Sequence, residues 1–305
     1  MFWSDKRYHS LDYYFKNKYG QKVQKLSLDA GMTCPTRDGT KGTGGCIFCS
    51  NSGSGDFTTK RCENVTAQID KAICSLSKNK KSGGQFIAYF QSYTNTYAPV
   101  AYLKNIFTEA ILHKDIIGLS IATRPDCLEP EIIELLKELN EIKPVWIELG
   151  LQTIHEATAE FIRRGYPLAT FNEAVKNLNN AGIEIIVHVI LGLPHETKSD
   201  ILETISYLSH MPIAGIKLQL LHVLKDTDLA GHLGTFHILS EDEYVELVID
   251  CLEILPDNIV IHRLTGDGPS DLLIEPLWSL KKRNVLNHIN KRMKERATWQ
   301  GRLFK

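Results

Sequence analysis

A chain of 305 residues, 43% of them hydrophobic, is long enough to form one barrel-sized domain. Its net charge of −1 conceals a strong segregation: residues 281–305 hold nine Lys/Arg and one acid, which leaves 26 basic and 35 acidic residues elsewhere. No apolar run reaches the roughly 18 residues that span a bilayer, and the N-terminus has no secretory apolar segment. We therefore expect a cytoplasmic protein whose thiols stay reduced.

Residues 1–22 mix aromatic side chains with lysine and arginine. Basic residues interleaved with rings suit nucleic acid, because cations meet phosphates while rings stack on bases. The alternative, an N-terminal arm that packs its rings against the rest of the fold, carries at least equal weight.

The segment Gln21–Ala30 is typical of a strand, and it leads into a glycine-rich loop with three cysteines, Cys34, Cys46 and Cys49. The spacing is C-x11-C-x2-C, and glycines between the cysteines allow the tight turns that a metal loop needs. Three thiolates leave one iron of a [4Fe-4S] cluster without a protein ligand. An open coordination site of this kind can bind and activate another molecule.

Two other interpretations of the cysteines were weighed. Cys62 could complete a four-cysteine structural zinc site, but such sites usually use two C-x2-C pairs and only one is present. A disulfide framework is weaker still, because the cysteine count is seven and no signal peptide precedes it.

After the loop, strands and helices alternate, which predicts a parallel sheet covered by helices. Six strand-helix units are too few for a closed eight-stranded barrel, so we expect an α/β fold: an open, partial (β/α)6 TIM-like barrel. We divide it into an N-terminal arm (1–22), a core (23–268) and a basic helical extension (269–305), forming one compact domain. The strands are expected at Gln21–Ala30, Gln85–Gln91, Ile116–Thr123, Val145–Gln152, Glu184–Leu191 and Gly215–Leu221. The helices are expected at 64–79, 99–113, 129–140, 156–181 (broken at 165–167), 197–209 and 241–255. A further short strand is expected at Asn258–Leu264, and a helical tail from about 270.

The loops that leave the carboxyl ends of parallel strands converge, so polar residues there are candidates for a site. Gln91 and Ser92 follow one strand, and Arg124 and Asp126 follow the next. The polar run at Gln91 could equally be ordinary turn chemistry, and the Arg124 and Asp126 side chains could simply pair with each other.

Three more candidates lie on strands. Glu148 and Gln152 share one face of an otherwise apolar strand, where burial is costly without polar partners such as those of a bound ligand. His188 lies on the next strand and either contacts a ligand or is an ordinary core histidine.

In six ordered blocks the chain resembles radical S-adenosylmethionine (radical SAM) enzymes, in the long-spaced form of the elongator catalytic subunit and its small bacterial relatives of the YtqA/YhcC type. The blocks are DAGMTCPTRDGTKGTGGCIFC, FIAYFQSYTNTYAP, IATRPDCL, WIELGLQTIHEATAEFIRRGY, HVILGLPHET and IHRLTGDGP. The resemblance implies a [4Fe-4S] cluster on the three loop cysteines, S-adenosylmethionine as cofactor, and its reductive cleavage to a 5′-deoxyadenosyl radical. It also implies an electron donor such as flavodoxin or ferredoxin.

The resemblance further assigns cofactor contacts. Arg164, rather than Arg163, matches the position that meets the cofactor carboxylate, and Phe48 is the aromatic residue before the last cysteine. Gln91 and Ser92 stand where the wider superfamily often has Gly-Gly-Glu, and the acid is missing here. His188 replaces the first glycine of a G-x-I-x-G-x-x-E pattern that contacts adenine.

Relatives in the elongator branch act on the wobble uridine of tRNA, so the resemblance implies modification of its C5 substituent, such as conversion of carboxymethylaminomethyl to aminomethyl. The basic tail independently favours RNA, although charge runs are usually solvated surface. The rivals are a radical SAM enzyme acting on a protein or small metabolite, and a non-catalytic zinc-bound RNA-binding module. The candidate substrate-binding residues are Arg124, Asp126, Gln219, Lys291, Arg292 and Lys294.

Overall fold

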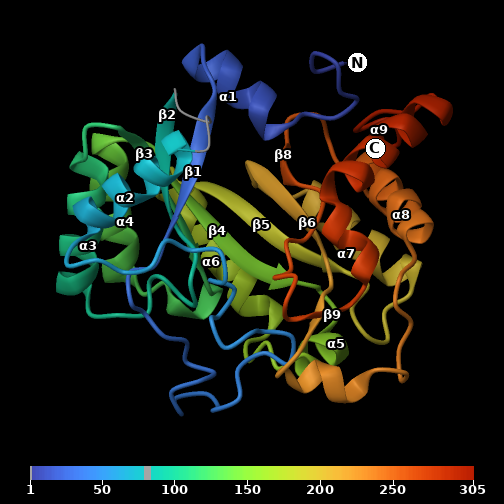
Figure 1. Ribbon diagram of the computed structural model, residues 1–305, viewed down its shortest axis with the longest axis horizontal. Helices are drawn as coiled ribbons and strands as arrows, with labels where there is room; N and C mark the ends of the chain where they lie inside the picture. Colours follow the sequence, from blue (N-terminus) through green and yellow to red (C-terminus); the bar gives the residue numbers. More distant parts are fainter. Residues whose placement is uncertain (1, 79–83) are drawn as a thin grey trace.

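The computed structural model describes residues 2–78 and 84–305, so residue 1 of the expected arm and residue 79 of an expected helix lie outside it. A seven-stranded parallel sheet organises the chain, in the order β1-β2-β3-β4-β5-β6-β8 (Figure 1). Its strands are β1 (Val23–Leu28), β2 (Gln85–Phe90), β3 (Ile116–Thr123), β4 (Val145–Gln152), β5 (Glu184–Leu191), β6 (Gly215–Leu220) and β8 (Val260–Arg263).

Helices connect successive strands and cover the outer face of the sheet (Figure 1). They supply the apolar stripes against which the sheet buries its Val, Ile and Leu side chains, giving one continuous core. The connecting helices are α2 (Val65–Lys78), α3 (Val100–Leu112), α4 (Pro130–Ile142), α5 (Glu156–Phe161), α6 (Leu168–Asn180), α7 (Lys198–Ser209) and α8 (Glu241–Ile254).

The prediction of an open partial α/β barrel is confirmed, and the sheet is one strand wider than the six expected units. The short strand expected at 258–264 joins the sheet as β8 and pairs in parallel with β6. The chain from 270 is not simply helical. It contains β9 (Leu273–Glu275), which pairs antiparallel with β7 (Val223–Leu224), and a single 3-10 segment, Leu277–Lys281, before α9 (Lys282–Glu295).

The inner face of the sheet changes character along the strands. At the amino ends of the strands, Phe15, Ile87, Trp146 and Ile186 form a small apolar cluster that fills the bottom of the barrel. Toward the carboxyl ends the inward side chains become polar, as for Glu148 on β4. This gradient leaves the polar end free to form a site.

The N-terminal arm packs against the barrel rather than projecting from it. Helix α1 (Leu11–Tyr19) contacts both β1 and β8, the two edge strands of the open sheet, and the Ile261 amide donates to the His9 carbonyl at 2.7 Å. Trp3, Tyr8 and Phe15 are buried. These rings are therefore part of the fold, as the packing alternative predicts, and not available for stacking on bases.

The basic tail forms α9, which packs against α8. Several of its cations are paired with acids of α8: Arg292 meets Glu246, and Arg296 contacts Glu246, Asp250 and Glu253. None of the helices in residues 2–78 and 84–305 is long and apolar enough to cross a membrane.

Candidate functional site

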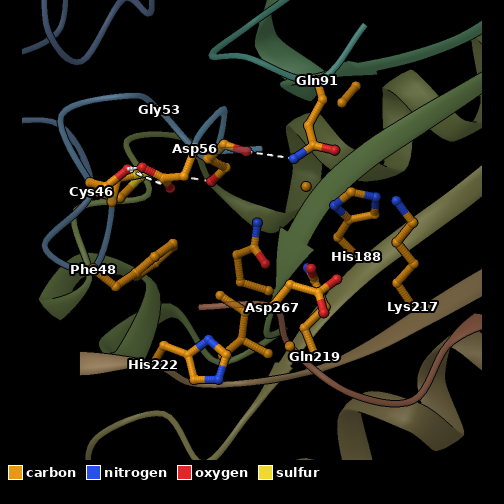
Figure 2. A pocket seen from close by; sticks show the side chains of 18 of the residues that line it. Cys46, Phe48, Gly53, Asp56, Gln91, His188, Lys217, Gln219, His222 and Asp267 are labelled. Atoms are coloured by element: carbon orange, nitrogen blue, oxygen red, sulfur yellow. Dashed lines mark hydrogen bonds between the residues drawn. The ribbon is translucent and has the colours of Figure 1, made fainter. Parts of the chain in front are cut away.

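A cavity of about 560 Å³ opens at the carboxyl ends of the strands. This is the end at which β/α barrels carry their sites, and the volume is in the range of small-molecule pockets. Figure 2 shows Cys46 and Phe48 on one side of it and His188 and Lys217 on the other. The cysteine loop, which follows β1, forms one wall; the rest is lined mainly by residues of β1 to β8 and of segments 266–269 and 279–282.

The cysteine loop is fixed by its own side chains and by the barrel. Arg37 donates through Nη2 to the carbonyls of Cys49 at 3.1 Å and Ser50 at 2.7 Å. Gly45 has φ +72°, and a Cβ there would lie 2.7 Å from Arg37 Nε, so a side chain would displace this tie. Ile47 is buried and accepts a hydrogen bond from the Leu229 amide at 2.9 Å, which anchors the loop across the mouth of the barrel.

Cys34, Cys46 and Cys49 all line the cavity, whereas Cys62 does not. In the described part of the chain, three or more side chains with ligand atoms all within 4.8 Å of one another occur at His155, Asp200 and Glu203, so at least one pair of the three cysteine sulfurs lies further apart than 4.8 Å. Sulfurs around a single zinc ion sit about 3.8 Å apart, given Zn–S bonds of about 2.3 Å. The wider spacing fits a cluster of several irons better than one zinc ion.

Burial raises the pKa of Cys46 to about 12 and raises that of Cys49, and the neighbouring thiols add to the effect at Cys46. Buried thiols of this kind ionise when a positively charged centre binds them. The donor set, its shared cavity and its spacing therefore fit the cluster that the resemblance implies.

The residues at the end of β2 divide into two roles. Gln91 lines the cavity and donates through Nε2 to the Ser54 carbonyl at 2.6 Å, tying the cysteine loop to the strand. Ser92 is buried, does not line the cavity, and reaches Thr58 Oγ1 at 3.4 Å. This position fits a residue that stabilises a turn, the alternative given for this polar segment, better than a residue that contacts the cofactor.

Gln152 is the clearest indication of a ligand-binding position. It lines the cavity at the end of β4, and its buried Oε1 has no hydrogen-bond partner among the described residues. An unpaired buried carbonyl oxygen is costly, so a donor from a bound molecule would stabilise it. Glu148, Gly150 and Gln152 all line the cavity, as the period of two along the strand predicts.

Glu148 is fully buried but has protein partners. Lys25 donates to Oε1 at 2.5 Å, Ser120 donates to Oε1 at 2.6 Å, and Lys217 also donates to the carboxylate. Burial alone would raise the pKa of Glu148, but the charges of Lys217 and Lys25 outweigh it and hold the pKa well below its usual range. Its burial therefore does not require a ligand, contrary to the argument from sequence.

His188 contacts Glu148 Oε2 through Nε2 at 2.7 Å and lines the cavity. Burial, with the positive charge of Lys217, lowers its pKa to about 4, so the ring is neutral at neutral pH. The Nε2–H then donates to the carboxylate, and Nδ1 is left as an acceptor. Such an acceptor suits the amino group of an adenine.

Arg164 is 2% exposed, and its guanidinium is occupied by the protein. It donates to the carbonyls of Tyr166 at 3.0 Å and Thr153 at 2.6 Å, and it meets Glu156 at 3.2 Å. The structure thus gives it the role of fixing the end of β4. This differs from the cation open to the cofactor that the sequence argument expects. Neighbouring Arg163 is half exposed and pairs with Asp228.

The expected substrate-binding residues lie in two separate regions. Arg124 and Gln219 line the cavity, but Arg124 forms a bidentate pair with Asp126 at 2.9 Å for both bonds, and Asp126 lies outside the lining. The pairing of Arg124 with Asp126 is the alternative to substrate binding that the sequence analysis gives. Lys291, Arg292 and Lys294 are on α9 and do not line the cavity.

Sequence reasoning missed several lining residues. Lys217 stands inside the apolar strand GIKLQL, so the cost argument used for Glu148 could have found it. Arg263 lies in the IHRLTGDGP block, but nothing in its spacing indicates which way it points. Further lining residues that the sequence reasoning missed include Phe57, Tyr89, Tyr166, His222, Asp267 and Lys282.

With the fold and the cavity in view, the comparisons with known proteins identify the class. The model of the Radical SAM superfamily matches residues 39–208, and the model of the Radical_SAM C-terminal domain matches residues 213–295. The chain belongs to the Radical SAM superfamily and is a radical SAM enzyme. Membership implies a [4Fe-4S] cluster and S-adenosylmethionine, which the donor set on the cysteine loop fits.

Among individual proteins, the chain is similar to YtqA of Bacillus subtilis (strain 168), with 44% identity over 303 residues covering 99% of this chain and 94% of YtqA. It is also similar to the tRNA uridine(34) acetyltransferase of Methanocaldococcus jannaschii, with 26% identity over 189 residues covering 59% of this chain and 33% of the relative. The solved structure of the archaeal Methanocaldococcus infernus Elp3 with an N-terminal deletion shares the fold. Its TM-score is 0.69 at 17% identity, over 91% of this chain and 64% of that chain.

Proposed function

We propose that this enzyme uses S-adenosylmethionine to modify the C5 substituent of the wobble uridine of tRNA, converting carboxymethylaminomethyl-uridine toward aminomethyl-uridine. The observation that carries the proposal is one cavity that joins three cluster-ligating thiols to a deep polar wall. The choice of tRNA is supported by similarity to a tRNA uridine(34) acetyltransferase.

Cys34, Cys46 and Cys49 hold the cluster in this proposal, and Gln152 and His188 orient the cofactor. When bound, cluster and cofactor together would supply a 5′-deoxyadenosyl radical that takes a hydrogen from the methylene of the carboxymethyl group. Loss of one more electron and a proton from the substrate, followed by addition of water, would break the C–N bond and release the group as glyoxylate, with S-adenosylmethionine, converted to methionine and 5′-deoxyadenosine, as the two-electron oxidant. Gln152 Oε1 accepts from the cofactor ammonium or a ribose hydroxyl, and His188 Nδ1 accepts from the adenine amino group. Phe48 packs beside the cofactor on the cysteine loop and helps to exclude water.

The cavity mouth offers contacts that suit a nucleotide. Phe57 lines the cavity on the cysteine loop, is 57% exposed, and presents a ring on which a base can stack. Lys282, at the start of α9, also lines the cavity; its ammonium pairs with Asp267 at 2.6 Å, but its side chain is 43% exposed and can meet a phosphate as well. A flipped base would enter between them.

The test compares modified nucleosides in tRNA from cells with and without the gene. We expect carboxymethylaminomethyl-uridine to accumulate and aminomethyl-uridine and its products to disappear in the deletion strain. Restoring the wild-type gene, but not one encoding Cys46→Ala, should reverse both changes. Identical nucleoside profiles in the two strains would contradict the tRNA substrate and favour a protein or small-metabolite substrate.

A further inference from the structure

The inner wall of the cavity carries more positive than negative charge. Lys25 from β1 and Lys217 from β6 both contact the single carboxylate of Glu148. Tyr89 accepts from Lys217 Nζ at 3.0 Å, but burial and the charge of Glu148 raise its pKa well above its usual value, so it remains a neutral phenol. Two ammonium groups therefore share one carboxylate inside the barrel.

A second pair of cations shares one carboxylate beside the neighbouring strand, β8. Arg263 on β8 and Lys282 at the start of α9 both contact Asp267, at 3.3 Å and 2.6 Å. His188 and His262 add no charge, because burial lowers their pKa values. Among the described residues, Lys217, Arg263 and Lys282 line this part of the cavity and, together with Lys25 outside the lining, share the two carboxylates of Glu148 and Asp267.

Lys217 and Arg263 belong to adjacent parallel strands and are partners in register. Their side chains therefore leave the same face of the sheet next to each other, and both line the cavity. The Lys217 side chain is 5% exposed and that of Arg263 is 27% exposed. A cation pair this deep is costly unless an anion meets it, and burial already lowers the pKa of Lys217 to about 7.

We propose that Lys217 and Arg263 form an anion-binding subsite that receives the carboxylate of the substrate's C5 substituent. The inference rests on the proposed function and deepens it, since it makes the carboxymethyl group the recognised feature. A guanidinium beside an ammonium can hold one carboxylate with two or more charge-assisted hydrogen bonds. Glu148, Tyr89 and Asp267 then hold the two cations in place.

The carboxylate of S-adenosylmethionine is the other source of the same chemistry. Figure 2 places Lys217 across the cavity from Cys46, on the loop that would hold the cluster and, beside it, the cofactor's carboxylate in the proposed function. A carboxylate held there is not available to Lys217 and Arg263. The experiment therefore measures substrate and cofactor binding separately.

The test uses the anaerobically reconstituted protein with S-adenosylmethionine bound and two anticodon stem-loop RNAs. One carries carboxymethylaminomethyl-uridine at the wobble position, and the other carries the same group with its carboxylate replaced by a carboxamide. We expect the wild-type protein to bind the carboxylate RNA about tenfold or more tightly. Arg263→Gln and Lys217→Gln should bind both RNAs with the weaker affinity.

Arg283→Gln is the matched control, because Arg283 is an exposed cation near the start of α9 that does not line the cavity. It should keep the preference for the carboxylate RNA. Cofactor affinity without RNA should be unchanged in Arg263→Gln, and its circular dichroism and iron content confirm folding.

Equal binding of the two RNAs by the wild-type protein would overturn the subsite while leaving the proposed function standing. A loss of cofactor affinity in Arg263→Gln as large as the loss of RNA affinity would assign the cations to the cofactor carboxylate and also overturn it. Failure of the wild-type protein to bind either RNA would contradict the proposed function, and the subsite would fall with it.

Discussion

At the scale of single residues, the structure separates two cofactor candidates, Gln152 and Arg164, that the sequence analysis names together. It fills the donors of Arg164 with protein carbonyls, and it leaves Gln152 Oε1 without a partner in the described residues. Which of two polar groups is satisfied depends on the path of the backbone after β4, and no sequence pattern specifies it.

Replacing Gln152 with Ala should therefore weaken S-adenosylmethionine binding about tenfold, because a charge-assisted hydrogen bond to the cofactor is lost. Equilibrium binding to the reconstituted protein measures this, with iron content expected to stay at the wild-type level. Arg164→Ala should mainly lower the unfolding temperature, since it removes bonds to the carbonyls at the end of β4. Cofactor binding that is unaffected by Gln152→Ala would move the contact elsewhere.

The cysteines give a second prediction at this scale. Alanine at Cys34, Cys46 or Cys49 should abolish iron binding after anaerobic reconstitution, because each lines the cavity. Cys62→Ala should retain its iron, since Cys62 lies outside the lining and contacts the Lys60 carbonyl. Iron and sulfide analysis with the visible absorption spectrum measures both. Iron loss in Cys62→Ala as large as that in Cys46→Ala would show a four-cysteine site instead.

At the scale of elements, the strands were the most predictable part. Three of them, at Ile116–Thr123, Val145–Gln152 and Glu184–Leu191, coincide with the expected ranges, because a strand buried on both faces is a short continuous apolar run. The β7–β9 pair was missed because strands of two and three residues are too short to show a period.

The charged wall was not predictable in the same way. Glu148 stood out inside an apolar strand, but its partners Lys25 and Lys217 lie on strands more than 60 residues away on either side. The alignment of Lys217 with Arg263 further depends on a register shift between Ile216 and Lys217. Such a shift arises from the curl of the sheet and leaves no mark in the sequence.

Because side chains from four other strands, β1, β3, β5 and β6, contact Glu148, its replacement by Gln should be strongly destabilising. The change leaves Lys25 and Lys217 without a carboxylate in the barrel interior, at a cost of about 3–5 kcal/mol. Urea unfolding at neutral pH measures it. The control is Glu138→Gln on α4, whose ion pair with Lys104 is exposed and worth less than about 1 kcal/mol. Equal small losses in the two variants would mean that the buried network is not structural.

At the scale of the whole molecule, the two basic terminal segments of the chain pack in different ways. The N-terminal arm bridges the open edges of the sheet and buries the rings of Trp3, Tyr8 and Phe15. Helix α9 begins at the cavity mouth with Lys282. Its other cations lie further from the cavity, where the helix packs against α8. Any RNA that reaches the cavity at that end could also pass over this helix.

We predict that Lys291 and Lys294 contribute to RNA binding through phosphates. Neutralising both should flatten the slope of log affinity against log salt by about 1.4, at roughly 0.7 per contact. Arg292 is left intact because Glu246 holds it. Binding should weaken alike for all tRNAs. Lys104→Gln with Lys137→Gln, exposed cations on α3 and α4, serves as the control. An unchanged salt slope would make α9 a packing helix only.

The most direct test of the central claim is a reaction of the reconstituted protein with S-adenosylmethionine, a reductant and tRNA bearing carboxymethylaminomethyl-uridine. The products to measure together are 5′-deoxyadenosine and the modified nucleoside. Our account predicts that both form in step, that wobble aminomethyl-uridine appears, and that neither forms with Cys46→Ala. Formation of 5′-deoxyadenosine with no change in the tRNA would contradict the wobble uridine as substrate.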